Sequence, residues 1–109
     1  MTSTFTPETF THYLRSSVAH NTTQLDAFDA KTGWTPDWSD VINRNAVTEV
    51  HATVLRWVDN GRDIAEVKSA LLEHVMNAAR NPVRSTNPID TYREQCLNAA
   101  RVALLETLP

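Results

Sequence analysis

The sequence lacks the cross-links and the long apolar runs that mark small secreted proteins and membrane proteins. It has a single cysteine among 109 residues, Cys96, which cannot close an intramolecular disulfide and cannot by itself form a zinc site. No apolar run approaches the roughly 18 residues that a membrane-spanning helix needs, and the opening stretch MTSTFTPETF has neither the basic start nor the apolar middle of a signal peptide. We therefore expect a cytoplasmic protein that does not associate with membranes.

A strong charge of one sign is also absent. The formal net charge is −3, which argues against a protein that holds nucleic acid through a general positive field. The hydrophobic fraction of 41% and the charged fraction of 21% are typical of a globular protein and exclude extended disorder. We predict one helical domain over residues 1–109, with residues 1–5 as a flexible tail, because a chain of this length supports about one core.

Glycine is scarce, and no stretch alternates apolar and polar residues for long enough to predict a strand. Helix starts are instead marked by a capping side chain, a proline and an acid, at Thr6-Pro7-Glu8, Thr35-Pro36-Asp37 and Asn87-Pro88-Ile89-Asp90. A fourth start is indicated by Asp63 and Glu66, which have the spacing of a capping box. Helix stops are expected at Gly33, Gly61 and Asn81-Pro82.

These signals predict an all-α fold, a compact bundle of four principal helices over about 7–31, 36–59, 64–80 and 88–107. The first two helices are expected to form an antiparallel hairpin across Gly33. The polar stretch HNTTQ at 20–24 is rich in weak helix formers, so a break of the first helix at that point is left open.

Each predicted helix carries an apolar stripe at helical spacing. The core candidates are Phe10, Leu14, Val18, Leu25 and Phe28 in the first helix, Val47, Val50, Val54, Trp57 and Val58 in the second, and Ile64, Val67, Leu71, Val75 and Ala78 in the third. In the third helix Leu72, Met76 and Ala79 widen the apolar band, which indicates contact with two neighbouring elements.

The last predicted helix is apolar on nearly every side. One stripe contains Tyr92, Cys96, Ala99 and Ala103, a second contains Leu97, Ala100 and Leu104, and Val102 and Leu105 occupy the remaining side. Such a helix is either central in its own fold or covered by another chain, and scattered surface apolar residues are the ordinary alternative. We expect this segment to bind a second copy of the chain or another protein through Val102, Leu105 and Leu108.

Two tryptophans, Trp34 and Trp38, bracket the start of the second predicted helix. One ring could fold back on the other as a variant of the hydrophobic staple, which would make both structural. Alternatively one ring is exposed, and an exposed tryptophan at the junction of a loop and a helix is a typical interface anchor. Both residues are therefore candidate partner-binding positions.

The connection RNPVRSTNP, residues 80–88, is the strongest candidate for an anion site. Cations and hydroxyls lie before a helix start whose free amides could hold a phosphate, and the candidates are Arg80, Arg84, Ser85, Thr86 and Arg93. The competing interpretation is a simple link between two helices, since serine and threonine populate turns and Asn87 is expected as the cap. A capping Asn87 would occupy an amide that a phosphate needs.

Metal and catalytic constellations are not indicated by the sequence. The four histidines fall on at least three predicted helices and none has another histidine at i+4, so we expect no metal and no cofactor. The function predicted is a non-enzymatic interaction module, such as a small regulator, inhibitor or assembly subunit, that associates with itself through an apolar helix surface. The alternative is a nucleic-acid or phosphate-ligand binding protein that uses the arginines around residues 80–93.

Overall fold

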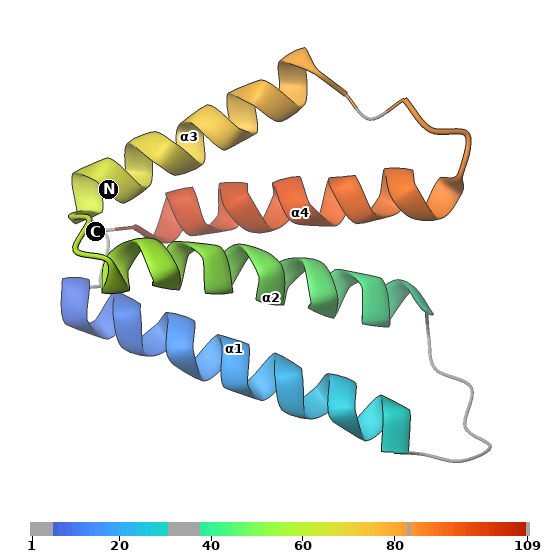
Figure 1. The fold of residues 1–109 in the computed structure, drawn as a ribbon, viewed down its shortest axis with the longest axis horizontal. Helices are drawn as coiled ribbons and strands as arrows, with labels where there is room; N and C mark the ends of the chain where they lie inside the picture. Colours follow the sequence, from blue (N-terminus) through green and yellow to red (C-terminus); the bar gives the residue numbers. More distant parts are fainter. Residues whose placement is uncertain (1–5, 31–37, 83, 109) are drawn as a thin grey trace.

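The computed structural model describes residues 6–30, 38–82 and 84–108 of the chain, without the side chains of Pro7, residues 27–30 and Trp38. The described residues form helices and no strand: α1 Pro7–Ala30, α2 Trp38–Asp59, α3 Ile64–Arg80 and α4 Pro88–Thr107 (Figure 1). The all-α bundle of four helices is therefore confirmed. The expectations for the tail at 1–5, for Gly33 and for the helix start at Thr35 lie outside the described residues.

The helix ends form by the local chemistry that the sequence indicates. Thr6 Oγ1 accepts from the backbone N–H of Thr9 at 3.2 Å, which caps α1. At the start of α3, Asp63 accepts from Glu66 N at 2.8 Å and Glu66 accepts from Asp63 N at 3.3 Å, a complete capping box. Gly61 has a φ of +91°, in the left-handed region that ends α2.

The first helix is continuous, so the break that was left open at 20–24 does not occur. Its polar residues are accommodated by bonds back to the preceding turn. Asn21 Nδ2 donates to Ser17 O at 3.0 Å, and Thr23 Oγ1 donates to Ala19 O at 2.9 Å. These bonds offset the weak helix propensity of the stretch.

The helices pack side by side in the order α1, α2, α4, α3, and α3 also contacts α2. Helices α1 and α2 lie antiparallel side by side, α2 also packs against α4, and α4 packs against α3 (Figure 1). Helix α3 begins near the end of α2 and leans away from α4 toward its own C-terminal end. It touches both α2 and α4, as expected, but Leu72, Met76 and Ala79, on which that expectation rested, are exposed.

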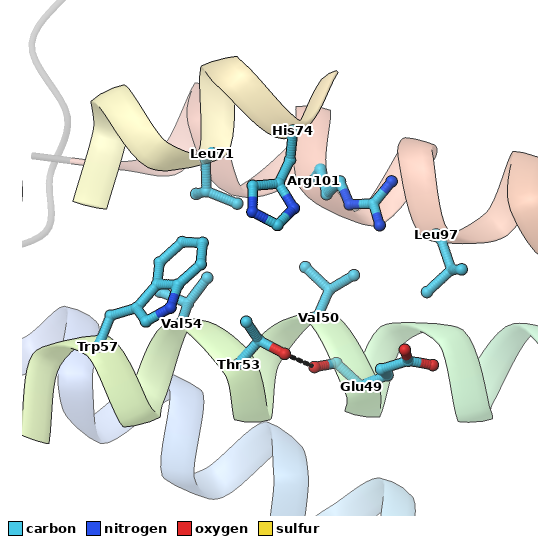
Figure 2. Close-up of a pocket in the computed structure, with 9 residues that line it drawn as sticks. All are labelled: Glu49, Val50, Thr53, Val54, Trp57, Leu71, His74, Leu97 and Arg101. Atoms are coloured by element: carbon cyan, nitrogen blue, oxygen red, sulfur yellow. Dashed lines mark hydrogen bonds between the residues drawn. The ribbon is translucent and has the colours of Figure 1, made fainter. Parts of the chain in front are cut away.

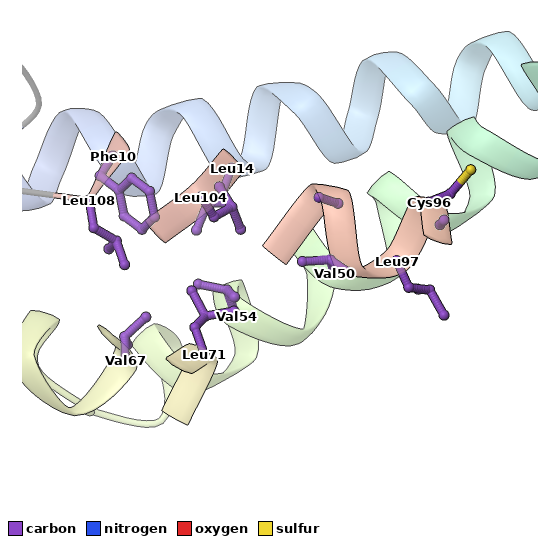
Figure 3. Packing of buried hydrophobic residues seen from close by; sticks show 12 residues of the cluster. Phe10, Leu14, Val50, Val54, Val67, Leu71, Cys96, Leu97, Leu104 and Leu108 are labelled. Carbon is purple, nitrogen blue, oxygen red and sulfur yellow. The ribbon is translucent and has the colours of Figure 1, made fainter. Parts of the chain in front are cut away.

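One apolar cluster joins the four helices (Figure 3). Its buried members are Phe10, Leu14, Ala46, Val50, Val54, Val67, Leu71, Cys96, Leu97, Ala100, Leu104 and Leu108. Each large apolar side chain removed from water in this way stabilises the fold by about 1.5–3 kcal/mol. Six predicted stripe positions on α1, α2 and α3 are confirmed as core, whereas Ala46 was not expected.

Helix α4 buries only one of its two predicted stripes. Leu97, Ala100 and Leu104 are in the core, whereas Tyr92, Ala99 and Ala103 are exposed and only Cys96 of that stripe is buried. The helix contacts α2 on one side and α3 on the next, which leaves its remaining side without a covering element in the described part of the chain. Helix α4 is thus not enclosed by its own fold.

A polar chain of contacts crosses the seam between α1 and α2. His51 is buried, and its Nδ1 shares a hydrogen bond of 2.7 Å with Ser17 Oγ. The chain continues through Asn21 to Arg44, whose Nη1 lies 3.2 Å from Asn21 Oδ1 and whose Nε lies 2.9 Å from Asp40 Oδ2. Burial lowers the pKa of His51 below its ordinary value, since the charged imidazolium loses its hydration there. These bonds give the helix hairpin a specific register.

Candidate functional site

The two tryptophans proposed as partner anchors cannot be compared with the fold. Trp34 lies outside the described residues, and Trp38 is described only as the first residue of α2. Their roles as a staple or as anchors stay predictions.

The C-terminal candidates divide into one exposed residue and two that support the core. Val102 is 36% exposed on α4, whereas Leu105 is partly buried and packs against the core cluster. Leu108 is only 4% exposed, in contrast to the expectation that it faces a partner. The chain leaves the helical conformation at Leu108, whose backbone N–H still bonds to Leu104 O, and this end geometry directs its side chain inward. Leu108 therefore packs into the core at the C-terminal end of α4 and is not available to a partner.

Large exposed apolar residues at helical spacing occur on α3, as Ile89 and Tyr92 do at the start of α4. Leu72 is 50% exposed and Met76 is 43% exposed, and the alanines at 65 and 79 are exposed as well. Residues 65, 72, 76 and 79 are separated by seven, four and three positions, the spacing of a coiled-coil seam, so they share one face. We call these four residues the outer strip of α3. The sequence signal for it was the widened apolar band of this helix.

Polar residues of the connection before α4 hydrogen-bond to one another and to the first turn of that helix. Ser85 Oγ donates to Asp90 Oδ2 at 2.9 Å and accepts from Asn87 N at 3.1 Å. Asn87 Oδ1 accepts from Ile89 N at 3.0 Å, as expected of the cap, which occupies an amide that an anion would need. Thr86, Arg80 and Arg84 are exposed.

Arg93, the remaining member of the proposed anion site, is paired with another helix. Its Nη2 donates to Glu49 Oε2 of α2. The structure thus brings Ser85 and Asn87 together as a helix start, and it directs the guanidinium of Arg93 to a carboxylate on α2.

A groove that the sequence did not reveal lies between α2, α3 and α4 (Figure 2). It has a volume of about 120 Å³, and we call it the α2–α3–α4 groove. Its lining residues are Glu49, Val50, Thr53, Val54, Trp57, Leu71, His74, Leu97 and Arg101. His74 meets the Trp57 ring edge-on, with 5.4 Å between ring centroids. The groove combines an aromatic and aliphatic wall with a few polar groups, as small-ligand sites do.

Two further hollows flank the contact of α3 with α4. One, of about 460 Å³, is lined by His74, Asn77, Ala78, Asn81, Glu94 and Arg101. The other, of about 240 Å³, includes Asn98, whose buried Oδ1 has no hydrogen-bond partner in the described part of the chain. His74 and Arg101 line both the first hollow and the α2–α3–α4 groove, so these two spaces meet at the same polar pair.

The side chains that carry catalytic or metal chemistry are not gathered among the described residues. Within 6–30, 38–82 and 84–108, three or more His, Cys, Asp or Glu side chains nowhere come close enough to hold a metal ion. The Ser17 and His51 pair resembles a nucleophile and base, but no carboxylate in the described segments hydrogen-bonds to His51. None of the described helices has the length and apolar character needed to span a membrane.

Comparisons with known proteins give no relative for this chain. No family model, no curated protein and no solved structure matches it.

Proposed function

We propose that this protein is a non-catalytic interaction module that pairs with a second copy of itself through the outer strip of α3. The observation that carries the proposal is the pair of large apolar side chains, Leu72 and Met76, about half exposed on successive turns of one helix. Contiguous exposed apolar surface at regular spacing is typical of a protein interface. Small regulators, inhibitors and assembly subunits belong to this class of protein.

Self-pairing suits the strip because a symmetric contact uses the same surface twice. A seam with coiled-coil spacing is complementary to its own copy, since knobs of one helix enter holes of the other. The exposed residues beside the strip include both signs of charge, Glu66, Lys68, Glu73 and Arg80. A second copy therefore does not meet a surface of purely like charge.

The strength of the pairing follows from the exposed apolar surface. Burying a Leu or Met side chain contributes about 1.5–3 kcal/mol, so covering the exposed half of two such residues in two copies contributes about 3–6 kcal/mol. Association itself costs a similar or larger free energy. These two side chains alone therefore do not offset the cost of association, and a dimer also needs the alanines of the strip and the charges beside it. The expected dimer is weak, with a dissociation constant of about 0.1 mM or above.

The proposal is tested by placing a charge in the strip. Met76→Glu would bury a carboxylate in the dimer, so we expect dimerisation to weaken at least about tenfold. Ala19→Glu is the matched control, because it adds the same charge at an exposed position of α1. Mass is measured by sedimentation equilibrium, and urea unfolding checks that both variants remain folded. Equal dimerisation of the two variants contradicts the proposal.

A further inference from the structure

Arg101 is the most buried of the ion-paired arginines in the described part of the chain, and it alone among them has no hydrogen-bond acceptor. Its side chain is 18% exposed, and its Nη1 lies 3.7 Å from Glu94 Oε1, which is too far for a hydrogen bond. The other three arginines each donate a hydrogen bond to a carboxylate: Arg15, Arg44 and Arg93. A guanidinium has five donors, and those of Arg101 are not among the fully buried atoms without a partner, so they remain open to solvent and to a ligand.

The unused donors of Arg101 face the α2–α3–α4 groove and the hollow beside it. Figure 2 shows the guanidinium and the His74 ring projecting into the same space, above Val50 and Thr53 of α2. The amides of Asn77 and Asn81 line the adjoining hollow. The opposite end of the groove is formed by Val54, Trp57 and Leu71 and is apolar. One end therefore offers hydrogen-bond donors, and the other end offers a surface for carbon atoms.

We propose that the α2–α3–α4 groove binds a small organic acid, with its carboxylate on Arg101 and its apolar body against Trp57 and Leu71. A planar guanidinium matches a carboxylate through two parallel hydrogen bonds, which are stronger than neutral ones. The groove volume of about 120 Å³ is well below the roughly 300–1,000 Å³ of pockets for drug-sized ligands, so the apolar body is short.

The charges around the groove set which ligand is accepted. Glu49 is occupied by Arg93, so it does not compete for Arg101. Glu94 is the competing carboxylate, and it is partly exposed, so it can turn toward water when a ligand arrives. His74 lies two positions from Met76, about 200° around the helix. The acid site is therefore on the side of α3 away from the outer strip and does not depend on self-pairing.

Butyrate is a suitable probe, with butanol and butylamine as matched compounds without the carboxylate. We expect butyrate to shift the NMR signals of the Trp57 indole, the His74 ring and Arg101 Nε in a saturable way at millimolar concentration. Arg101→Gln should weaken binding about 10- to 100-fold, because charge-assisted hydrogen bonds are lost. Glu94→Gln should strengthen binding about 2- to 5-fold, since a partly exposed opposing pair is removed. Arg15→Gln, at an exposed position of α1, which contributes no lining residue, should leave it unchanged.

Three results would overturn the proposal. The first is the absence of any saturable shift with butyrate, which would mean that water alone satisfies Arg101. The second is equal binding of butanol, which would assign the groove to apolar compounds in general. The third is butyrate binding that is no weaker in Arg101→Gln. If that variant does not fold, Glu94→Gln decides, and unchanged or weaker binding in it contradicts the proposal.

Discussion

Replacing Ser17 by alanine removes the hydroxyl that hydrogen-bonds to His51 Nδ1 at 2.7 Å in the seam between α1 and α2. His51 is 5% exposed, so water has little access to the ring nitrogen that loses its partner. A buried polar group left without a partner costs about 1–3 kcal/mol. Alanine also has a higher helix propensity than serine, by up to about 0.7 kcal/mol, which partly offsets that cost.

The neighbouring Ser16 provides the control, because it is exposed on the same helix and its replacement by alanine carries the same propensity gain. Subtracting the two changes leaves the lost bonds of the Ser17 hydroxyl, which are the one with His51 and a longer one of 3.4 Å from Asn21 Nδ2. Ser17→Ala should therefore be about 1–3 kcal/mol less stable than Ser16→Ala. Urea unfolding followed by far-ultraviolet circular dichroism measures both variants. Equal stability of the two variants would refute the assignment of a buried, bonded His51.

Three further outcomes are expected. Burial lowers the pKa of His51 below its ordinary 6.5, so between the two pKa values the unfolded chain binds more protons. Stability should therefore fall as pH drops below about 6.5 and level off below the folded pKa, and His51→Gln should flatten this loss in urea titrations. Gly61→Ala should lower the free energy of unfolding by about 1–2 kcal/mol, measured in urea, because alanine is strained at a φ of +91°. An added Cβ meets nothing within 4 Å, so no clash contributes, and a stabilised variant would contradict this expectation. Cys96, 7% exposed, should react with a thiol reagent only after unfolding, and labelling of the folded chain at the rate of a free thiol would contradict its burial.

The helix ends were predictable because they depend on a few neighbouring residues. The Asp63 and Glu66 capping box, the Asn87 cap and the left-handed Gly61 are each determined within one turn of the chain. Stripes of apolar residues likewise predicted most of the core, since one buried face follows from helical periodicity.

The features that the sequence did not predict depend on contacts between distant elements. Which stripe of α4 is buried depends on where α2 and α3 lie. Leu97 and Ala99 each belong to a predicted apolar stripe, yet Leu97 is buried and Ala99 is exposed. His51 is buried against a hydroxyl from α1, and the groove beside Arg101 forms only where α2 and α3 pack against α4. Leu108 was misplaced for a local reason, because the chain leaves the helical conformation there and the side chain turns into the core.

The central claim, that the chain pairs with its own copy through α3, is tested most directly by the mass of the unaltered protein. Sedimentation equilibrium from about one to several hundred micromolar covers the range expected for a weak dimer. The claim predicts an average mass that rises with concentration from the 12.3 kDa of one chain toward about twice that value. A mass that stays at 12.3 kDa over the whole range would contradict it.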